Sequence, residues 1–119
     1  MPIVLGGDDS VPIPLLGAFA GRGAFTVLQI DAHIDFRDDI AGERLGLSST
    51  MRRASEMEHV RRMILVGQRG LGSARSSDLA DAKTAGVHFV SSHQVHTAGV
   101  DPVLDLIEPG AEPPRHLRL

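Results

Sequence analysis

The 119-residue sequence contains no cysteine, no tryptophan and no tyrosine, and its aromatic residues are four phenylalanines. The absence of cysteine excludes disulfide bonds and thiolate metal ligands, and it fits the cytoplasmic location that we expect. So little aromatic surface offers few platforms for stacking nucleic-acid bases. The formal net charge of −3 also provides no basic surface, so we expect neither a nucleic-acid partner nor binding to an anionic membrane.

Long hydrophobic runs are absent as well. No apolar stretch approaches the roughly 20 residues that a membrane-spanning helix needs, and the N-terminus lacks the basic-then-apolar order of a signal peptide. Hydrophobic residues make up 42% of the chain and charged residues 23%, which is ordinary for a soluble globular protein. The length suits one domain with a modest core.

Short apolar runs alternate with segments that have helical spacing. The predicted strands are 2–5, 24–30, 63–66 and 87–91. The predicted helices are a short one through 15–19, one capped by Ser48 or Ser49, one capped by Ser76 or Ser77, and 101–107. Alternation at this spacing predicts parallel βαβ units in a three-layer α/β/α sandwich with a mainly parallel sheet.

The end of the chain departs from this pattern. Residues 111–119 contain two prolines and alternating basic residues where another strand is due, and proline is a poor strand residue. We therefore predict a domain over residues 1–110 and a disordered tail over 111–119.

One segment concentrates residues with metal-binding chemistry. Asp31, His33 and Asp35 follow an apolar strand at every other position, and alternate side chains of an extended backbone point the same way. Oxygen ligands with one imidazole suit manganese better than a soft-ligand zinc site. In the competing interpretation Asp31 caps a turn, His33 makes a local hydrogen bond and Asp35 is solvated.

A second acidic pair, Asp8 and Asp9, follows the first predicted strand directly after Gly6 and Gly7. Ligands of open α/β sheets bind at the carboxyl ends of the strands, and paired glycines permit close backbone approach to such a site. These features favour a metal site built from both acidic sets over a simple helix cap.

Two other patterns carry less functional information. The glycine-rich stretch 67–72 matches neither the dinucleotide fingerprint nor the P-loop, so we interpret it as a turn between a strand and a helix. His93 and His96 are three residues apart with no carboxylate near them in sequence, and we assign them no role.

Taken in order, the motifs resemble those of one enzyme family. Residues 5–10 (Leu-Gly-Gly-Asp-Asp-Ser) and 31–35 (Asp-Ala-His-Ile-Asp) resemble the metal-binding signature of the ureohydrolases, the arginase and agmatinase family. Residues 48–57 and 66–75 resemble the agmatinase and guanidinobutyrase branch. The resemblance covers residues 2 to about 110.

This resemblance implies an arginase-like fold and a site for two Mn²⁺ ions. Asp31 would match the bridging carboxylate, Asp35 a ligand of one ion and His33 a ligand of the other, while Asp9 stands where the family usually has a histidine ligand. The implied reaction is attack of a metal-activated hydroxide on the carbon of a small linear guanidino substrate, which yields urea and an amine. The complete family would form homo-oligomers.

The sequence also departs from the family pattern. It has residues 47–49 (Leu-Ser-Ser) where many members carry a histidine that shuttles protons, and it contains no Asp-x-Asp-x-x-Asp-Pro motif to complete the metal shells. We therefore expect a central fragment, truncated at both ends and inactive alone. Two alternatives remain: a non-catalytic α/β remnant or metal-binding module, and a flavodoxin-like or receiver-like module that holds Mg²⁺ at its strand ends.

Overall fold

Three parallel strands form the centre of the protein. The computed structural model describes residues 2–70, 72 and 74–107. Its strands are β1 (Phe25–Ile30), β2 (Val60–Val66) and β3 (His88–Val90), and they lie side by side in chain order. These strands confirm three of the predicted ones, because β-branched and aliphatic runs bounded by turns are typical of buried parallel strands.

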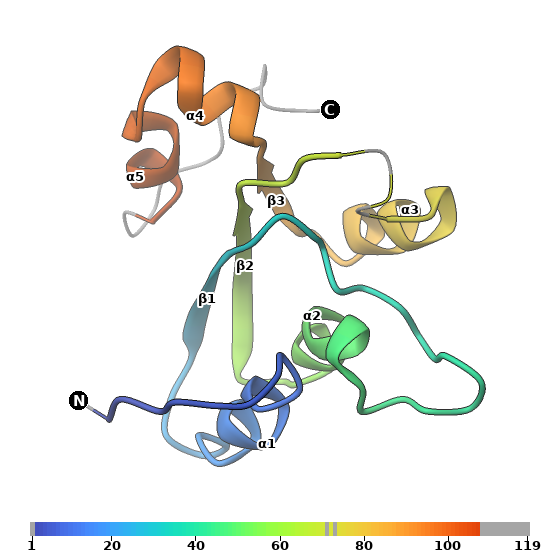
Figure 1. Ribbon diagram of the computed structural model, residues 1–119. Helices are drawn as coiled ribbons and strands as arrows, with labels where there is room; N and C mark the ends of the chain where they lie inside the picture. The colour runs from blue at the N-terminus through green and yellow to red at the C-terminus, as the bar shows by residue number, and fades with distance from the viewer. Residues whose placement is uncertain (1, 71, 73, 108–119) are drawn as a thin grey trace.

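Within the described part of the chain, five helices connect and cover the strands (Figure 1). They are α1 (Pro12–Gly17), α2 (Thr50–Ser55) after the 3₁₀ turn η1 (Leu47–Ser49), α3 (Ser76–Thr84), α4 (Ser92–Ala98) and α5 (Asp101–Ile107). The sequence did not predict α4. It begins with a reciprocal capping box, in which Ser91 N donates to Gln94 Oε1 at 2.8 Å and Gln94 N donates to Ser91 Oγ at 3.2 Å.

The core has two halves, one on each face of the sheet. Met63 and Leu65 of β2 pack with residues of α2 and α3 on one face, whereas Ile64 and Val66 pack against α5 on the other. Figure 1 shows α2 and α3 on one side of the strands and α4 and α5 on the other. This alternation along β2 confirms the predicted three-layer α/β/α arrangement with a parallel sheet.

The prediction of a strand at residues 2–5 was wrong. This segment is not part of the sheet, and Ile3 and Leu5 are 80% and 93% exposed. It runs toward α1 rather than along β1 (Figure 1), so its backbone meets no strand with which to form a ladder. The outer face of β1 is also open, with Leu28 41% and Ile30 78% exposed.

One prediction falls outside this description. The tail predicted at 111–119 lies outside the described residues. Across the described part of the chain, no helix has the length and apolar character that crossing a membrane requires.

Candidate metal centre

Asp31 sits where β1 ends. Its N–H donates to the carbonyl of Val66 at 2.9 Å, which continues the pairing of β1 with β2 by one residue. The chain then turns, because Asp31 Oδ1 accepts hydrogen bonds from His33 N at 2.7 Å and from the His33 ring at 3.2 Å. This local turn ends the extended backbone on which the predicted alternation of Asp31, His33 and Asp35 depended.

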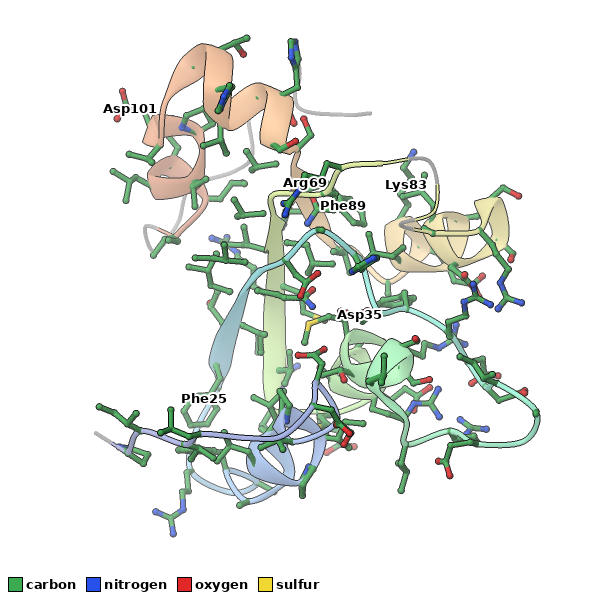
Figure 2. The ribbon with its side chains drawn as sticks, viewed as in Figure 1. Phe25, Asp35, Arg69, Lys83, Phe89 and Asp101 are labelled. Carbon is green, nitrogen blue, oxygen red and sulfur yellow. The ribbon has the colours of Figure 1, made fainter. Side chains whose placement is uncertain are left out.

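Asp35 is held in a left-handed backbone conformation, with φ of 47°. Its carbonyl accepts hydrogen bonds from the first amides of α2, Met51 N at 3.0 Å and Arg52 N at 3.2 Å. Its neighbours Ile34 and Phe36 are buried, with 3% and 1% exposed. A left-handed conformation at a residue with a side chain costs free energy, and these contacts fix it, placing Asp35 beside α2 in Figure 2.

The bonds to Asp35 also correct the prediction of how α2 is capped. Ser49 is the N-cap residue, yet its side chain accepts no capping hydrogen bond. The first amides of a helix need acceptors from outside the helix, and the carbonyl of Asp35 fills that role. The start of α2 is therefore built onto the loop that follows β1.

Asp9, in the N-terminal segment, also lies at the start of α2. The hydroxyl of Thr50 donates a hydrogen bond to the carbonyl oxygen of Asp9. The Asp9 carboxyl lies close enough to Asp35 for its charge to raise the pKa of the Asp35 carboxyl, and its Oδ2 is buried with no hydrogen-bond partner among the described residues. A buried carboxylate oxygen without a partner is costly and is the kind of atom that a cation would satisfy.

The three carboxyl groups influence one another electrostatically. The pKa of Asp35 is raised to about 6. Burial is the main cause, and the nearby charges of Asp9 and Asp31 raise the pKa further, whereas a hydrogen bond from Gln29 lowers it. The pKa of Asp9 is also raised, chiefly by burial and then by the charge of Asp31. Partial burial and like charge disfavour the ionised forms, so a bound cation would relieve both effects.

His33 takes a different position from the one predicted. Its side chain is 63% exposed and faces Asp31, which agrees with the alternative of a local hydrogen bond. Within residues 2–70, 72 and 74–107, no group of three or more His, Asp or Glu side chains is arranged to hold a metal ion. Metal ligation by Asp9, Asp31, His33 and Asp35 stays a prediction, although the donor set, oxygen-rich with one imidazole, fits manganese.

Two polar residues of the site were missed by the sequence reasoning. Gln29 donates from Nε2 to Asp35 Oδ2 at 2.7 Å, and its presence as the one polar residue near the end of an apolar strand was a usable signal. Thr50 gave no such signal, because its partner Asp9 is 41 residues earlier in the chain.

Ion pairs anchor the loop that follows Asp35. The Arg37 Nε lies 3.4 Å from Asp78 Oδ2 on α3, and Arg53 of α2, whose side chain is 7% exposed, donates to Asp38 at 2.7 Å. Charge-assisted bonds of this kind are stronger than neutral ones when they are partly buried. The loop is therefore fastened to both helices on its face of the sheet.

The glycine-rich stretch supports the site from the β2 side. Gly67 has φ of +98°, and a Cβ there would lie 3.2 Å from the carbonyl oxygen of Asp31. Two residues further along, Arg69 N donates a hydrogen bond to the carbonyl of Ala32 at 3.1 Å. This stretch therefore packs against the turn after β1, which agrees with its interpretation as a structural turn.

Comparison with known proteins identifies the family. The model of the arginase family matches residues 1–117. This chain belongs to the arginase family. Its members are hydrolases that act on the C–N bonds of amidino groups.

Individual members of the arginase family resemble the chain at low identity. The guanidinobutyrase of Pseudomonas aeruginosa is 27% identical over 107 residues, or 87% of this chain and 33% of that protein. A mitochondrial arginase of Medicago truncatula is 32% identical over 112 residues, or 92% of this chain and 31% of that one. The chain thus spans about a third of the length of these relatives.

Solved structures confirm the arginase-like fold. Medicago truncatula arginase superposes with a TM-score of 0.74 at 29% identity, over 87% of this chain and 32% of that one. Proclavaminate amidino hydrolase from Streptomyces clavuligerus gives a TM-score of 0.72 at 28% identity, over 86% of this chain and 33% of that one. The expected fold class is therefore correct.

Proposed function

We propose that this chain carries metal-binding residues of a manganese-dependent amidinohydrolase of the agmatinase type, which hydrolyses a linear guanidino compound to urea and an amine. The observation that carries the proposal is the meeting of Asp9 and Asp35, 26 residues apart in a chain of the arginase family, with Asp31 close enough to raise the pKa of both. The named substrates of its relatives, arginine and guanidinobutyrate among them, support a guanidino substrate.

Some of these residues would bind the metal, and others hold the binding residues in place. Asp9, Asp31 and Asp35 would hold manganese through oxygen atoms, and His33 would add an imidazole nitrogen by rotating away from Asp31. Bound manganese supplies Lewis acidity and lowers the pKa of water to near neutrality. Gln29 orients the Asp35 carboxylate through its 2.7 Å hydrogen bond, and the buried Ile34 and Phe36 keep the loop in place.

A carboxylate that does not hold manganese could attract the substrate. A guanidinium group is a planar cation whose N–H donors match carboxylate oxygens. Asp8 precedes Asp9 directly and is not assigned to the metal, so its charge favours a positively charged ligand near the site.

Calorimetric titration of the 119-residue chain with MnCl₂ tests the metal site. We expect Mn²⁺ to bind, and we expect the substitution D31N to abolish binding while the chain stays folded by circular dichroism. Exposed Asp105 on α5 provides the matched control, since D105N removes the same charge far from the site. A folded wild-type chain that binds no Mn²⁺ would contradict the proposal.

Urea release then separates two functions. Agmatine, 4-guanidinobutyrate and arginine are the probe substrates. Urea formation that needs Mn²⁺ and is lost in D31N supports the hydrolase. Because the sequence lacks the Asp-x-Asp-x-x-Asp-Pro motif, we expect no urea from the 119-residue chain alone, and the metal titration then decides the proposal. A second candidate, a non-catalytic metal-binding module, is favoured by the exposed position of His33.

A further inference from the structure

Thr50 is a fully buried residue that contacts the first acidic segment of the candidate site and begins the helix whose amides bind the second. Its exposed fraction is 0%. Its hydroxyl donates to the carbonyl oxygen of Asp9, and the carbonyl of Leu47 lies 3.3 Å away as a second acceptor. A buried hydroxyl is retained at low cost only when it is hydrogen-bonded, so these contacts define one orientation of the side chain.

The same residue begins the helix that holds Asp35. Thr50 is the first residue of α2, and the amides of the next two residues, Met51 and Arg52, donate to the Asp35 carbonyl at 3.0 Å and 3.2 Å. The side chain of Thr50 thus binds one segment while the backbone that directly follows it binds the other.

The residues before Asp9 are weakly packed, whereas those after it lead into α1, which contacts α2 and the core. Ile3, Val4 and Leu5 are 80%, 48% and 93% exposed, so apolar packing does little to fix the residues that lead to Asp9. A single buried hydrogen bond then has a large influence on where Asp9 lies.

We infer that Thr50 is a positioning residue, whose hydroxyl and helical first turn set the Asp9 carboxyl beside the Asp35 carboxyl. The expected effect on metal binding rests on the proposed function, whereas the positioning of Asp9 by Thr50 does not depend on it. Thr50 lies within residues 48–57, which resemble the agmatinase branch, but the residue predicted to cap the helix was Ser48 or Ser49.

Three variants test this role. T50V keeps the volume of the side chain and removes the hydroxyl, T50S keeps the hydroxyl, and T97V removes an exposed hydroxyl that bonds within α4, to the carbonyl of His93 at 3.0 Å. We expect T50V to raise the dissociation constant for Mn²⁺ on the order of tenfold, in line with the loss of one hydrogen bond. T50S should change it by less than about threefold, and T97V should leave it unchanged.

A metal-free measurement separates positioning from simple stabilisation. In ¹³C NMR spectra of the chain without metal, T50V should shift the side-chain carboxyl resonances of both Asp9 and Asp35, and T97V should shift neither. If T50V lowers the melting temperature but leaves both resonances and Mn²⁺ affinity unchanged, the inference is overturned. Should the wild-type chain bind no Mn²⁺, the proposed function fails, and the resonances alone decide the role of Thr50.

A measurement on the wild-type chain covers the case in which T50V does not fold. Hydrogen exchange read by mass spectrometry reports on the amides of Met51 and Arg52, which bind the Asp35 carbonyl. We expect added Mn²⁺ to slow their exchange, because a cation that fixes Asp35 also stabilises the first turn of α2. Unchanged exchange at saturating Mn²⁺ would overturn the inference.

Discussion

The substitution D35N should change the stability and the metal binding of this protein in opposite directions. Asp35 is partly buried near Asp9 and Asp31, and burial together with their charges raises its pKa to about 6. An asparagine at this position keeps the size of the side chain and can still accept the hydrogen bond from Gln29 while donating to Asp9. It removes the negative charge that the folded chain tolerates poorly.

The sign of the effect follows from proton linkage. A carboxyl group whose folded pKa is raised adds stability below its unfolded pKa of 3.8, and this contribution is lost as pH rises through about 6. The difference between these pKa values corresponds to roughly 3 kcal/mol, and screening by solvent at a partly exposed group reduces it to about 1–2 kcal/mol. At pH 8 we therefore expect D35N to unfold with a free energy about 1–2 kcal/mol higher than the wild type.

Urea denaturation at pH 8 and at pH 4, followed by circular dichroism, measures this difference. The gain should shrink at pH 4, where Asp35 is protonated in the folded chain. Calorimetry should show that D35N no longer binds Mn²⁺, whereas D105N, at an exposed position on α5, alters neither property. A loss of stability of more than about 1 kcal/mol in D35N at pH 8 would refute the reasoning, since it would mean that the Asp35 charge is stabilised in the folded chain.

Three further substitutions test the surroundings of the site. Burial raises the pKa of Asp78, but hydrogen bonds and charge from Arg75 outweigh it and leave the pKa lowered. D78N should therefore cost about 1–3 kcal/mol at pH 7 in urea denaturation, and this cost should decrease progressively as pH falls below 3.8 toward the lower folded pKa. L65A removes a side chain that is 0% exposed in β2 and should lower the free energy of unfolding by about 2–5 kcal/mol in the same assay; a smaller loss would mean that the sheet is loosely packed. G67A places a Cβ 3.2 Å from the carbonyl oxygen of Asp31, at a residue whose φ is +98°. It should lower the free energy of unfolding by about 1–2 kcal/mol and weaken Mn²⁺ binding in calorimetry. Unchanged affinity would show that this contact does not position Asp31.

The sequence predicted the sheet where local composition and burial agree. The runs that became β1 and the second half of β2 are mainly apolar, and β2 is covered on both faces, as such composition predicts. Residues 2–5 have similar composition but no neighbouring strand in the structure. A strand needs a partner for its backbone hydrogen bonds, and no local pattern tells which segments will become partners.

The residues of the candidate metal site stay a prediction, and the structure brings Asp31 and Asp35 near each other for a different reason from the one expected. Alternation along a strand was expected to bring Asp31, His33 and Asp35 together. The structure instead turns the chain at Asp31, exposes His33 and brings Asp35 back with a left-handed backbone. These features depend on hydrogen bonds from α2 and on two buried neighbours, which are tertiary contacts and have no period in the sequence.

The first turn of α2 is therefore the structural link between the two acidic motifs. Each motif alone is a short polar segment after an apolar run, and each has an ordinary explanation as a turn or a cap. They become one site because a buried hydroxyl binds the first motif and two adjacent helix amides bind the second. The resulting arrangement of carboxyl groups raises the free energy of the chain without metal, as the raised pKa of Asp9 and Asp35 indicates. Like charges at partly buried positions disfavour the ionised carboxylates, and a bound cation would offset that cost.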